Sequence, residues 1–357
     1  MYLDTIWHWP PMWPTLFCCI SLLSSFVLLF STWGKAIYST TAPKPQSTDS
    51  THEDDYPPVE PLPDFDWKTT EPIKIRPFNP KYNLTMSIQQ TTVNELIEMD
   101  KNYLDRIMLR RKLMAEFPNT VLASEDSVKP AVDELYTWLV GTYLPTRYPR
   151  MFEVRPSAGG ISPVLRNLIT GEDLSMSPGE TPRETLKTLG GLVDDDFLFL
   201  LPSEDGDSFT LKGFVTCFPN GFNTSKKLNM KLRDIHKPVP SYKEKLEKSM
   251  DRYFAKLKPG RFVKRANPVP LLSMTHADMQ KARVRVERQF LHRLPRSKAI
   301  VFSFKTLLYT LPEIKEEGLG DALADAIDGL NDGNAPGFHF YKRAAVWGAS
   351  AKAYLQS

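Results

Sequence analysis

The sequence has little cysteine, and its charge is nearly balanced. Three cysteines occur among the 357 residues, and Cys18 and Cys19 both lie in an apolar N-terminal run. The remaining one, Cys217, cannot form an internal disulfide alone, and an iron–sulfur cluster needs about four cysteine ligands. Both features are therefore excluded for the chain after that run. The formal net charge of +3 gives no reason to expect nucleic acid as a main partner.

Several signatures of catalysis are also missing. The sequence contains no Gly-rich dinucleotide turn after a strand, no phosphate-binding loop, no HExxH motif and no paired CxxC motif. The nucleophile elbow G-x-S-x-G is absent as well. Because no cofactor signature that supplies electrons is present, any redox chemistry must draw its electrons from another protein.

An uncharged apolar run occupies residues 13–33, which is about the length that a membrane-spanning helix needs. Trp13 and Trp33 at its ends suit the two interfacial belts of a bilayer. A cleaved signal peptide is the alternative, but no basic region precedes the run and no small-residue cleavage site follows it. We therefore expect residues 1–36 to be a transmembrane anchor. Lys35 and Lys44 place the rest of this single-pass membrane protein in the cytosol, with the endoplasmic reticulum as one candidate membrane.

Residues 37–71 are rich in proline, serine, threonine and acidic residues and show little periodicity. This composition predicts an extended, disordered stalk, followed by a folded domain over residues 72–357.

Helices and strands alternate in the predicted domain. Apolar residues at three-to-four spacing predict helices over residues 92–116, 130–144, 241–257 and 275–293. Short apolar runs bounded by turn residues predict strands over residues 196–201, 208–218 and 299–309. Ser241 and Glu244 have the spacing of a capping box. The fold class is therefore mixed α and β (α+β).

The most informative motifs follow one another between residues 217 and 304. In order they are Cys217-Phe-Pro, Ile235-His-Lys-Pro-Val-Pro, a helix with Asp251-Arg-Tyr-Phe, Arg265-Ala-Asn, Val284-Arg-Val-Glu-Arg-Gln-Phe-Leu-His-Arg-Leu-Pro-Arg-Ser and Val301-Phe-Ser-Phe. This order resembles the haem-dependent oxidative N-demethylase alpha-subunit-like family, whose fungal members are called HRQ family proteins. The resemblance covers about residues 72–347.

The resemblance implies a PAS-like haem-binding core wrapped by helices. It also implies a haem-dependent monooxygenase that holds haem b and oxidatively N-demethylates a secondary amine or related small molecule with dioxygen. Electrons would come from a separate flavin and iron–sulfur reductase, and formaldehyde would be released. Two alternatives remain: a haem-binding PAS-like sensor or carrier, and a non-catalytic interaction domain.

His236 is the first candidate for an axial ligand of the haem iron, because histidine is the commonest protein donor to haem. Pro238 and Pro240 restrict the backbone beside it. A loop histidine that caps a helix or bonds a carbonyl is the alternative interpretation. Cys217 could ligate iron as a thiolate, although a buried cysteine in a strand usually behaves as a small apolar residue.

The remaining site candidates lie in the two arginine-containing motifs. Arg288 and Arg293 are predicted to bind the haem propionates, because arginine forks bind carboxylates. Arg265 and Gln289 are further cofactor-binding candidates, and Glu287, Asn267 and His236 are candidates for catalysis. The alternatives are a solvated helix face for the arginines and a core salt bridge for the charged pairs.

Two other positions bear on this assignment. His292 is expected near the C-terminus of the predicted fourth helix, where a histidine complements the helix dipole. Pro268 stands where the family often has tryptophan, so the substrate pocket is expected to differ from that of its relatives.

Overall fold

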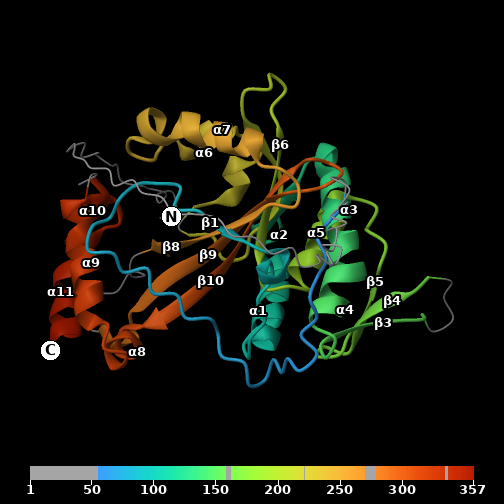
Figure 1. Cartoon of the computed structure of the whole chain (residues 1–357), viewed down its shortest axis with the longest axis horizontal. Coiled ribbons are helices and arrows are strands. Elements are labelled where there is room, and N and C mark those ends of the chain that lie inside the picture. Colours follow the sequence, from blue (N-terminus) through green and yellow to red (C-terminus); the bar gives the residue numbers. More distant parts are fainter. Residues whose placement is uncertain (1–54, 158–161, 221, 270–278, 334–336) are drawn as a thin grey trace, which may run out of the picture.

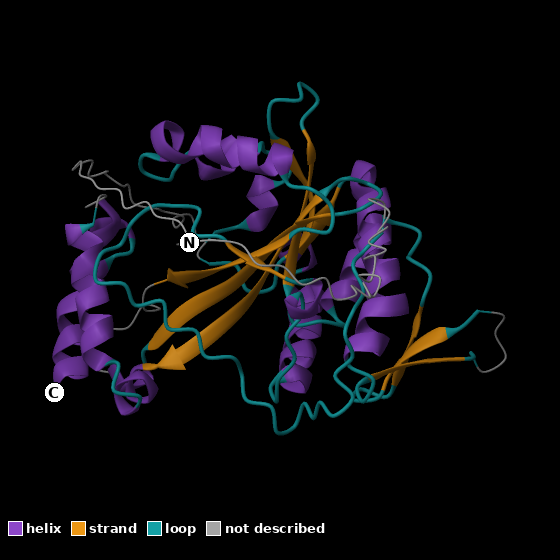
Figure 2. Ribbon diagram, viewed as in Figure 1, coloured by secondary structure: helices purple, strands orange, loops and turns teal. Residues whose placement is uncertain are grey.

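The computed structural model describes residues 55–157, 162–220, 222–269, 279–333 and 337–357 (Figure 1). Within these residues the larger sheet has seven antiparallel strands in the order β1-β8-β9-β10-β6-β7-β2 (Figure 2). The mixed α and β class is confirmed. The strands are β1 (Gln89–Thr91), β2 (Leu122–Ser124), β6 (Asp196–Pro202), β7 (Phe209–Val215), β8 (Phe262–Val269), β9 (Arg283–Arg293) and β10 (Ile300–Thr310).

A smaller antiparallel sheet has the order β3-β4-β5 and lies beside the helices of the N-terminal half (Figure 1). Its strands are β3 (Phe152–Arg155), β4 (Val164–Asn167) and β5 (Glu172–Ser175). The helices are α1 (Tyr103–Glu116), α2 (Pro118–Val121), α3 (Lys129–Trp138), α4 (Leu144–Arg147), α5 (Pro182–Gly190), α6 (Leu232–His236), α7 (Lys248–Lys256), α8 (Leu311–Glu316), α9 (Gly320–Asp332), α10 (Gly337–Tyr341) and α11 (Ala344–Gln356).

Three groups of helices cover the larger sheet. Helices α1, α3 and α5 pack on one face and form the largest apolar cluster with that face. Helices α6 and α7 pack across the other face, near the strands β6 and β7. Helices α8 to α11 enclose the far ends of β9 and β10 (Figure 1). The face under α6 and α7 is the one that carries the candidate site.

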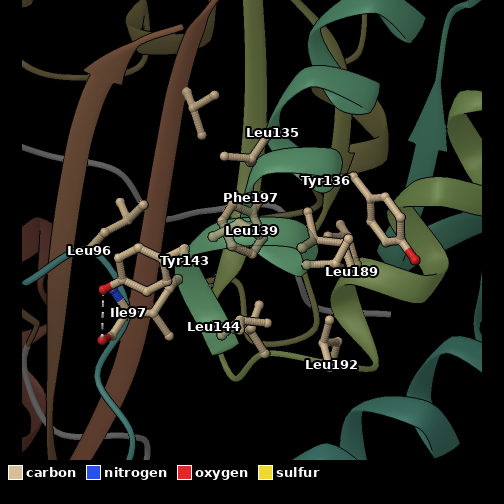
Figure 3. Close-up of a cluster of buried hydrophobic side chains, with 14 of the residues drawn as sticks. Leu96, Ile97, Leu135, Tyr136, Leu139, Tyr143, Leu144, Leu189, Leu192 and Phe197 are labelled. Carbon is tan, nitrogen blue, oxygen red and sulfur yellow. Dashed lines mark hydrogen bonds between the residues drawn. The ribbon is translucent and has the colours of Figure 1, made fainter. Parts of the chain in front are cut away.

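The largest apolar cluster is shown in Figure 3. Leu135, Leu139 and Phe197 are fully buried in it, and burial of each such side chain contributes roughly 1.5–3 kcal/mol. The buried hydroxyl of Tyr143 accepts a hydrogen bond from the backbone N–H of Ile97 at 3.2 Å. This bond ties the segment before α1 to the turn that follows α3.

The predicted helix over residues 275–293 is wrong. Residues 283–293 form strand β9, which pairs with β8 on one side and β10 on the other, and residues 270–278 lie outside the described part. The strand is buried along almost its whole length. Its arginines and its glutamate are paired inside the protein rather than exposed to solvent, so the charge pattern does not mark a solvated helix face.

Two helix boundaries also differ from the predictions. Residues 92–116 contain a short 3₁₀ turn (Val93–Glu95), and α1 begins only at Tyr103. The Asp100 carboxylate accepts the backbone N–H of Asn102 at 2.9 Å, which stabilises a turn before the helix. The predicted capping box at Ser241 is absent, because Ser241 has a left-handed backbone (φ 58°) and the helical region begins with a π turn (Lys243–Glu247).

The predicted single-pass membrane localisation is corrected here. Across the ranges that the structure describes, no helix has both the length and the apolar character to cross a bilayer. The proposed span, residues 13–33, and the first part of the predicted stalk, residues 37–54, lie outside the described residues. The rest of the predicted stalk lies against the domain: Tyr56 stacks on Trp138 with ring centroids 3.7 Å apart, and Phe65 contacts Tyr148 edge-on at 4.9 Å.

Candidate functional site

A cavity lies between the larger sheet and helices α6 and α7. It contains about 980 Å³ of space free of protein atoms, part of it open to solvent. The part that a water-sized sphere can occupy is about 130 Å³, which is smaller than the roughly 300–1,000 Å³ of typical small-molecule and cofactor sites. The walls are mainly apolar and come from β6, β7, β8, β9, β10, α6 and α7. The polar side chains in the lining are Lys227, His236, Lys264, Arg265 and Gln289.

His236 is the last residue of α6 and lines the cavity. Its Nδ1 lies 2.7 Å from the backbone carbonyl oxygen of Leu232. A carbonyl oxygen can only accept, so Nδ1 carries the proton and Nε2 has the lone pair in the neutral ring. Burial lowers the pKa of His236 to about 4, and the Leu232 carbonyl opposes this shift. The ring also stacks on Tyr242 with centroids 5.0 Å apart, which fixes its orientation.

Arg265 and Gln289 face His236 from the sheet. They are direct neighbours on the paired strands β8 and β9, so their side chains lie on the same face. Burial lowers the pKa of Arg265 to about 9, while Tyr82 and Glu287 oppose this shift. One donor of Arg265 reaches the Met86 carbonyl oxygen at 3.3 Å. The guanidinium therefore lies in the cavity wall, where it could meet a carboxylate.

Glu287 lies two residues before Gln289 on β9, on the same face of the strand, and is fully buried. One carboxylate oxygen pairs with Arg285 Nη2 at 2.9 Å, and the other accepts from Gln289 Nε2 at 2.7 Å. Arg285 is held by Thr306 Oγ1 at 3.0 Å and by the Phe218 carbonyl oxygen. This network connects β9 to β10 and to the segment after β7. Asn267 is buried on β8, directly opposite Glu287 in the register of the neighbouring strand β9.

Arg288 and Arg293 do not reach the cavity. Arg288 donates to the backbone carbonyl oxygen of Glu95, stacks over Phe290 at 4.4 Å and lies 3.5 Å from a Glu98 carboxylate oxygen. Arg293 donates to the backbone carbonyls of Phe254, Leu257 and Lys298, each at 2.6 Å. Both guanidiniums thus hold backbone segments together. Of the predicted site residues, His236, Arg265 and Gln289 line one cavity, and Glu287 and Asn267 adjoin it.

His292 and Cys217 lie away from the cavity. His292 is 1% exposed, stacks on Phe262 at 5.1 Å and sits in a strand rather than at a helix end. Burial lowers its pKa to about 3, so the ring is neutral. Burial raises the pKa of Cys217 to about 11, which disfavours the thiolate.

Sequence reasoning missed part of the polar surroundings. Lys227 lines the cavity from the 3₁₀ turn Thr224–Lys227. Lys342 is buried between α10 and α11, and its ammonium donates to the Tyr82 hydroxyl at 3.0 Å. Burial chiefly lowers the pKa of Lys342 to about 7, with Arg265 adding to the shift and Glu287 opposing it. Neither lysine lies in a recognisable motif, so only the three-dimensional arrangement connects them with Arg265.

The fold and the cavity define a class of protein: an antiparallel sheet covered by helices, with an apolar site that contains one oriented, neutral histidine. The family model described as haem-dependent oxidative N-demethylase, alpha subunit-like, matches residues 87–352. The chain therefore belongs to this family, and the sequence-based recognition is confirmed. The matched segment contains β1 to β10 and all of the polar residues named in the cavity lining.

Proposed function

We propose that the chain binds haem b in the cavity between the sheet and helices α6 and α7, with His236 as the axial ligand of the iron. The sheet with α6 and α7 across it would form the PAS-like core that the resemblance implies. The observation that carries this proposal is the His236 ring, whose Nδ1–H bonds the Leu232 carbonyl oxygen at 2.7 Å. Metal-ligating histidines are commonly fixed in this way through the nitrogen that does not bind the metal.

The chemical character of the residues around His236 suits a haem group, and the cavity of about 130 Å³ would have to widen to admit the ring. The lowered pKa keeps the imidazole neutral and able to ligate at physiological pH. The apolar walls suit a flat hydrophobic ring, and the Arg265 guanidinium suits a propionate carboxylate. Lys227 is a second cation in the same lining. This assignment gives Arg265 the role that the sequence assigned to Arg288 and Arg293.

We propose oxidative N-demethylation of a small N-methyl substrate as the reaction. One atom of dioxygen would enter a methyl C–H bond, and the other would leave as water after uptake of two electrons and two protons. The hydroxymethyl product would break its C–N bond and release formaldehyde and the N–H compound. Haem, when bound, would supply dioxygen activation, while the cavity walls exclude water and orient the substrate. A separate flavin and iron–sulfur reductase would supply the electrons.

The proposal is tested by absorption spectroscopy on the full chain expressed with ample haem supply. The expected result is a Soret band that His236→Ala shifts or removes. The matched control is His339→Ala, because His339 lies on α10 outside the cavity lining. A colourless wild-type protein would overturn haem binding. A spectrum that His236→Ala leaves unchanged would overturn the ligand assignment alone.

A further inference from the structure

The segment that covers the cavity carries a concentration of positive charge. Residues 226–261, which include α6 and α7, contain twelve lysines and arginines but only four aspartates and glutamates. The whole chain has a formal net charge of +3, so the residues outside this segment carry an excess of negative charge. Such an asymmetry within one chain favours an oppositely charged partner at the positive surface.

Helix α7 separates its charges from its apolar residues. Met250 and Phe254 line the cavity on its inner side. Lys248, Arg252 and Lys256 are exposed and repeat at four-residue spacing, so they form a line along the outer side. Like charges at this spacing destabilise a helix, and helix stability therefore does not account for the line.

The exposed cations of this segment are not compensated by acidic side chains. Lys231 and Arg233, at its edge, form ion pairs with Asp207. In the part of the chain that the structure describes, no ion pair involves six other exposed cations, which we call the basic face: Lys243, Lys245, Lys248, Arg252, Lys256 and Lys258. These residues belong to the helical roof over the larger sheet (Figure 1).

The basic face lacks the apolar side chains of a permanent interface. Among the described residues, every exposed large hydrophobic side chain lies outside residues 224–261. An anionic bilayer is disfavoured, because a helix that binds at a bilayer surface inserts its apolar side, and the apolar side of α7 faces the cavity. A polar and strongly charged surface suits a transient encounter between redox proteins, in which charge accelerates association.

We propose that the basic face docks the acidic surface of the iron–sulfur component of the electron-donating reductase. The inference rests on the proposed function, because it requires haem beneath α6 and α7. A docked partner would be separated from the cavity by one helix, which is roughly 10–12 Å across. Each encounter would pass one electron from a reduced [2Fe–2S] cluster to ferric haem iron, so that the cluster is oxidised and the iron becomes ferrous.

The test uses an acidic plant-type [2Fe–2S] ferredoxin as the probe and the full chain expressed with ample haem supply. Calorimetry measures binding of the oxidised ferredoxin, and stopped-flow absorption measures haem reduction by the reduced form. Raising the ionic strength from about 0.01 to about 0.1 M should slow the reduction of wild type roughly tenfold, because charge-steered association is screened by salt. The triple variant Lys248→Gln, Arg252→Gln and Lys256→Gln should lower the affinity and the rate constant about tenfold at the lower ionic strength.

A second triple variant is the matched control. Lys68→Gln, Lys112→Gln and Lys187→Gln remove the same charge from exposed positions outside the basic face, so affinity and rate should stay close to those of wild type. Equal losses in the two triple variants, or no loss in either, would overturn the inference. Binding to vesicles that contain phosphatidylserine, without binding to ferredoxin, would overturn it as well. Ferredoxin binding that depends on the basic face in protein without a Soret band would instead overturn haem binding and leave the docking surface intact.

Discussion

Arg110 on α1 is expected to be the most sensitive single position for stability. The side chain is fully buried, and its three donor groups reach Asp196 Oδ1 at 2.6 Å and the carbonyl oxygens of Gly190 and Asp195 at 2.7 Å. Asp196 in turn accepts the backbone N–H groups of Cys217 and the residue after it, at 2.9 and 2.8 Å. Arg110 therefore connects α1, the end of α5 and the segment that leads out of β7.

We expect Arg110→Met to remove most of this connection while keeping much of the side-chain volume. The substitution leaves a buried carboxylate without its partner, and breaking a buried pair in this way costs about 3–5 kcal/mol. Two carbonyl oxygens also lose their donor. Total stability of a domain is about 5–15 kcal/mol, so the loss is a large fraction of it.

The assay is equilibrium unfolding in urea, followed by far-UV circular dichroism, on wild type, Arg110→Met, Asp196→Asn and the double variant. The midpoint of Arg110→Met should fall by roughly 1 M or more, given slopes of about 1–3 kcal/mol per M. The double variant should lose less than the sum of the two single variants, because each partner is costly mainly when the other remains. A loss below about 1 kcal/mol for Arg110→Met, or additive losses, would refute this reasoning.

Two further predictions concern pH and packing. The folded pKa of His292 is about 3 against an ordinary value of 6.5, so its neutral form stabilises the fold above pH 6.5 and stability falls as the pH decreases below that value. His292→Phe, which keeps the stack on Phe262, should reduce the loss between pH 7 and pH 5 by about 2 kcal/mol in thermal or urea unfolding, and an unchanged pH dependence would contradict this. In Gly329→Ala the added methyl group would lie 2.3 Å from the carbonyl oxygen of Pro80, so we expect a loss of about 1–3 kcal/mol in the same assay. The matched control is Gly337→Ala, because an added Cβ there meets nothing within 4 Å; Gly206→Ala is unsuitable because Gly206 has a positive φ. Equal stability of Gly329→Ala and Gly337→Ala would contradict the packing argument.

The sequence correctly predicts the strands that consist of apolar runs with few charged residues. The runs around residues 196–201 and 299–309 contain few charges, and the structure confirms them as β6 and β10. Residues 283–293 behave differently because several of their arginines donate hydrogen bonds to backbone groups far away in the chain. Arg288 is bound at Glu95 and Arg285 at Phe218, and neither contact leaves a trace in local periodicity. The pattern therefore resembled an exposed helix.

The candidate site was also predictable only in part. His236, Arg265 and Gln289 were found through motifs, and the structure brings them to one cavity. Gln289 lines the cavity and Arg288 does not, because adjacent residues of a strand point to opposite faces of the sheet. A helical interpretation of this segment could not give that result. Lys342 was not predictable, because its proximity to Arg265 arises from the packing of the last helices against the sheet.

The segment before β1 has a practical consequence for defining the folded unit. Tyr56 and Phe65 cover Trp138 and Tyr148, and Leu62 donates its backbone N–H to the Arg147 carbonyl oxygen at 2.9 Å. A boundary chosen from composition alone, at residue 72, would strip this covering and leave aromatic rings of the main core open to water. The family match from residue 87 would cut away still more. Deletion variants of this protein should therefore retain the chain from residue 55 onward if the domain is to keep its native surface.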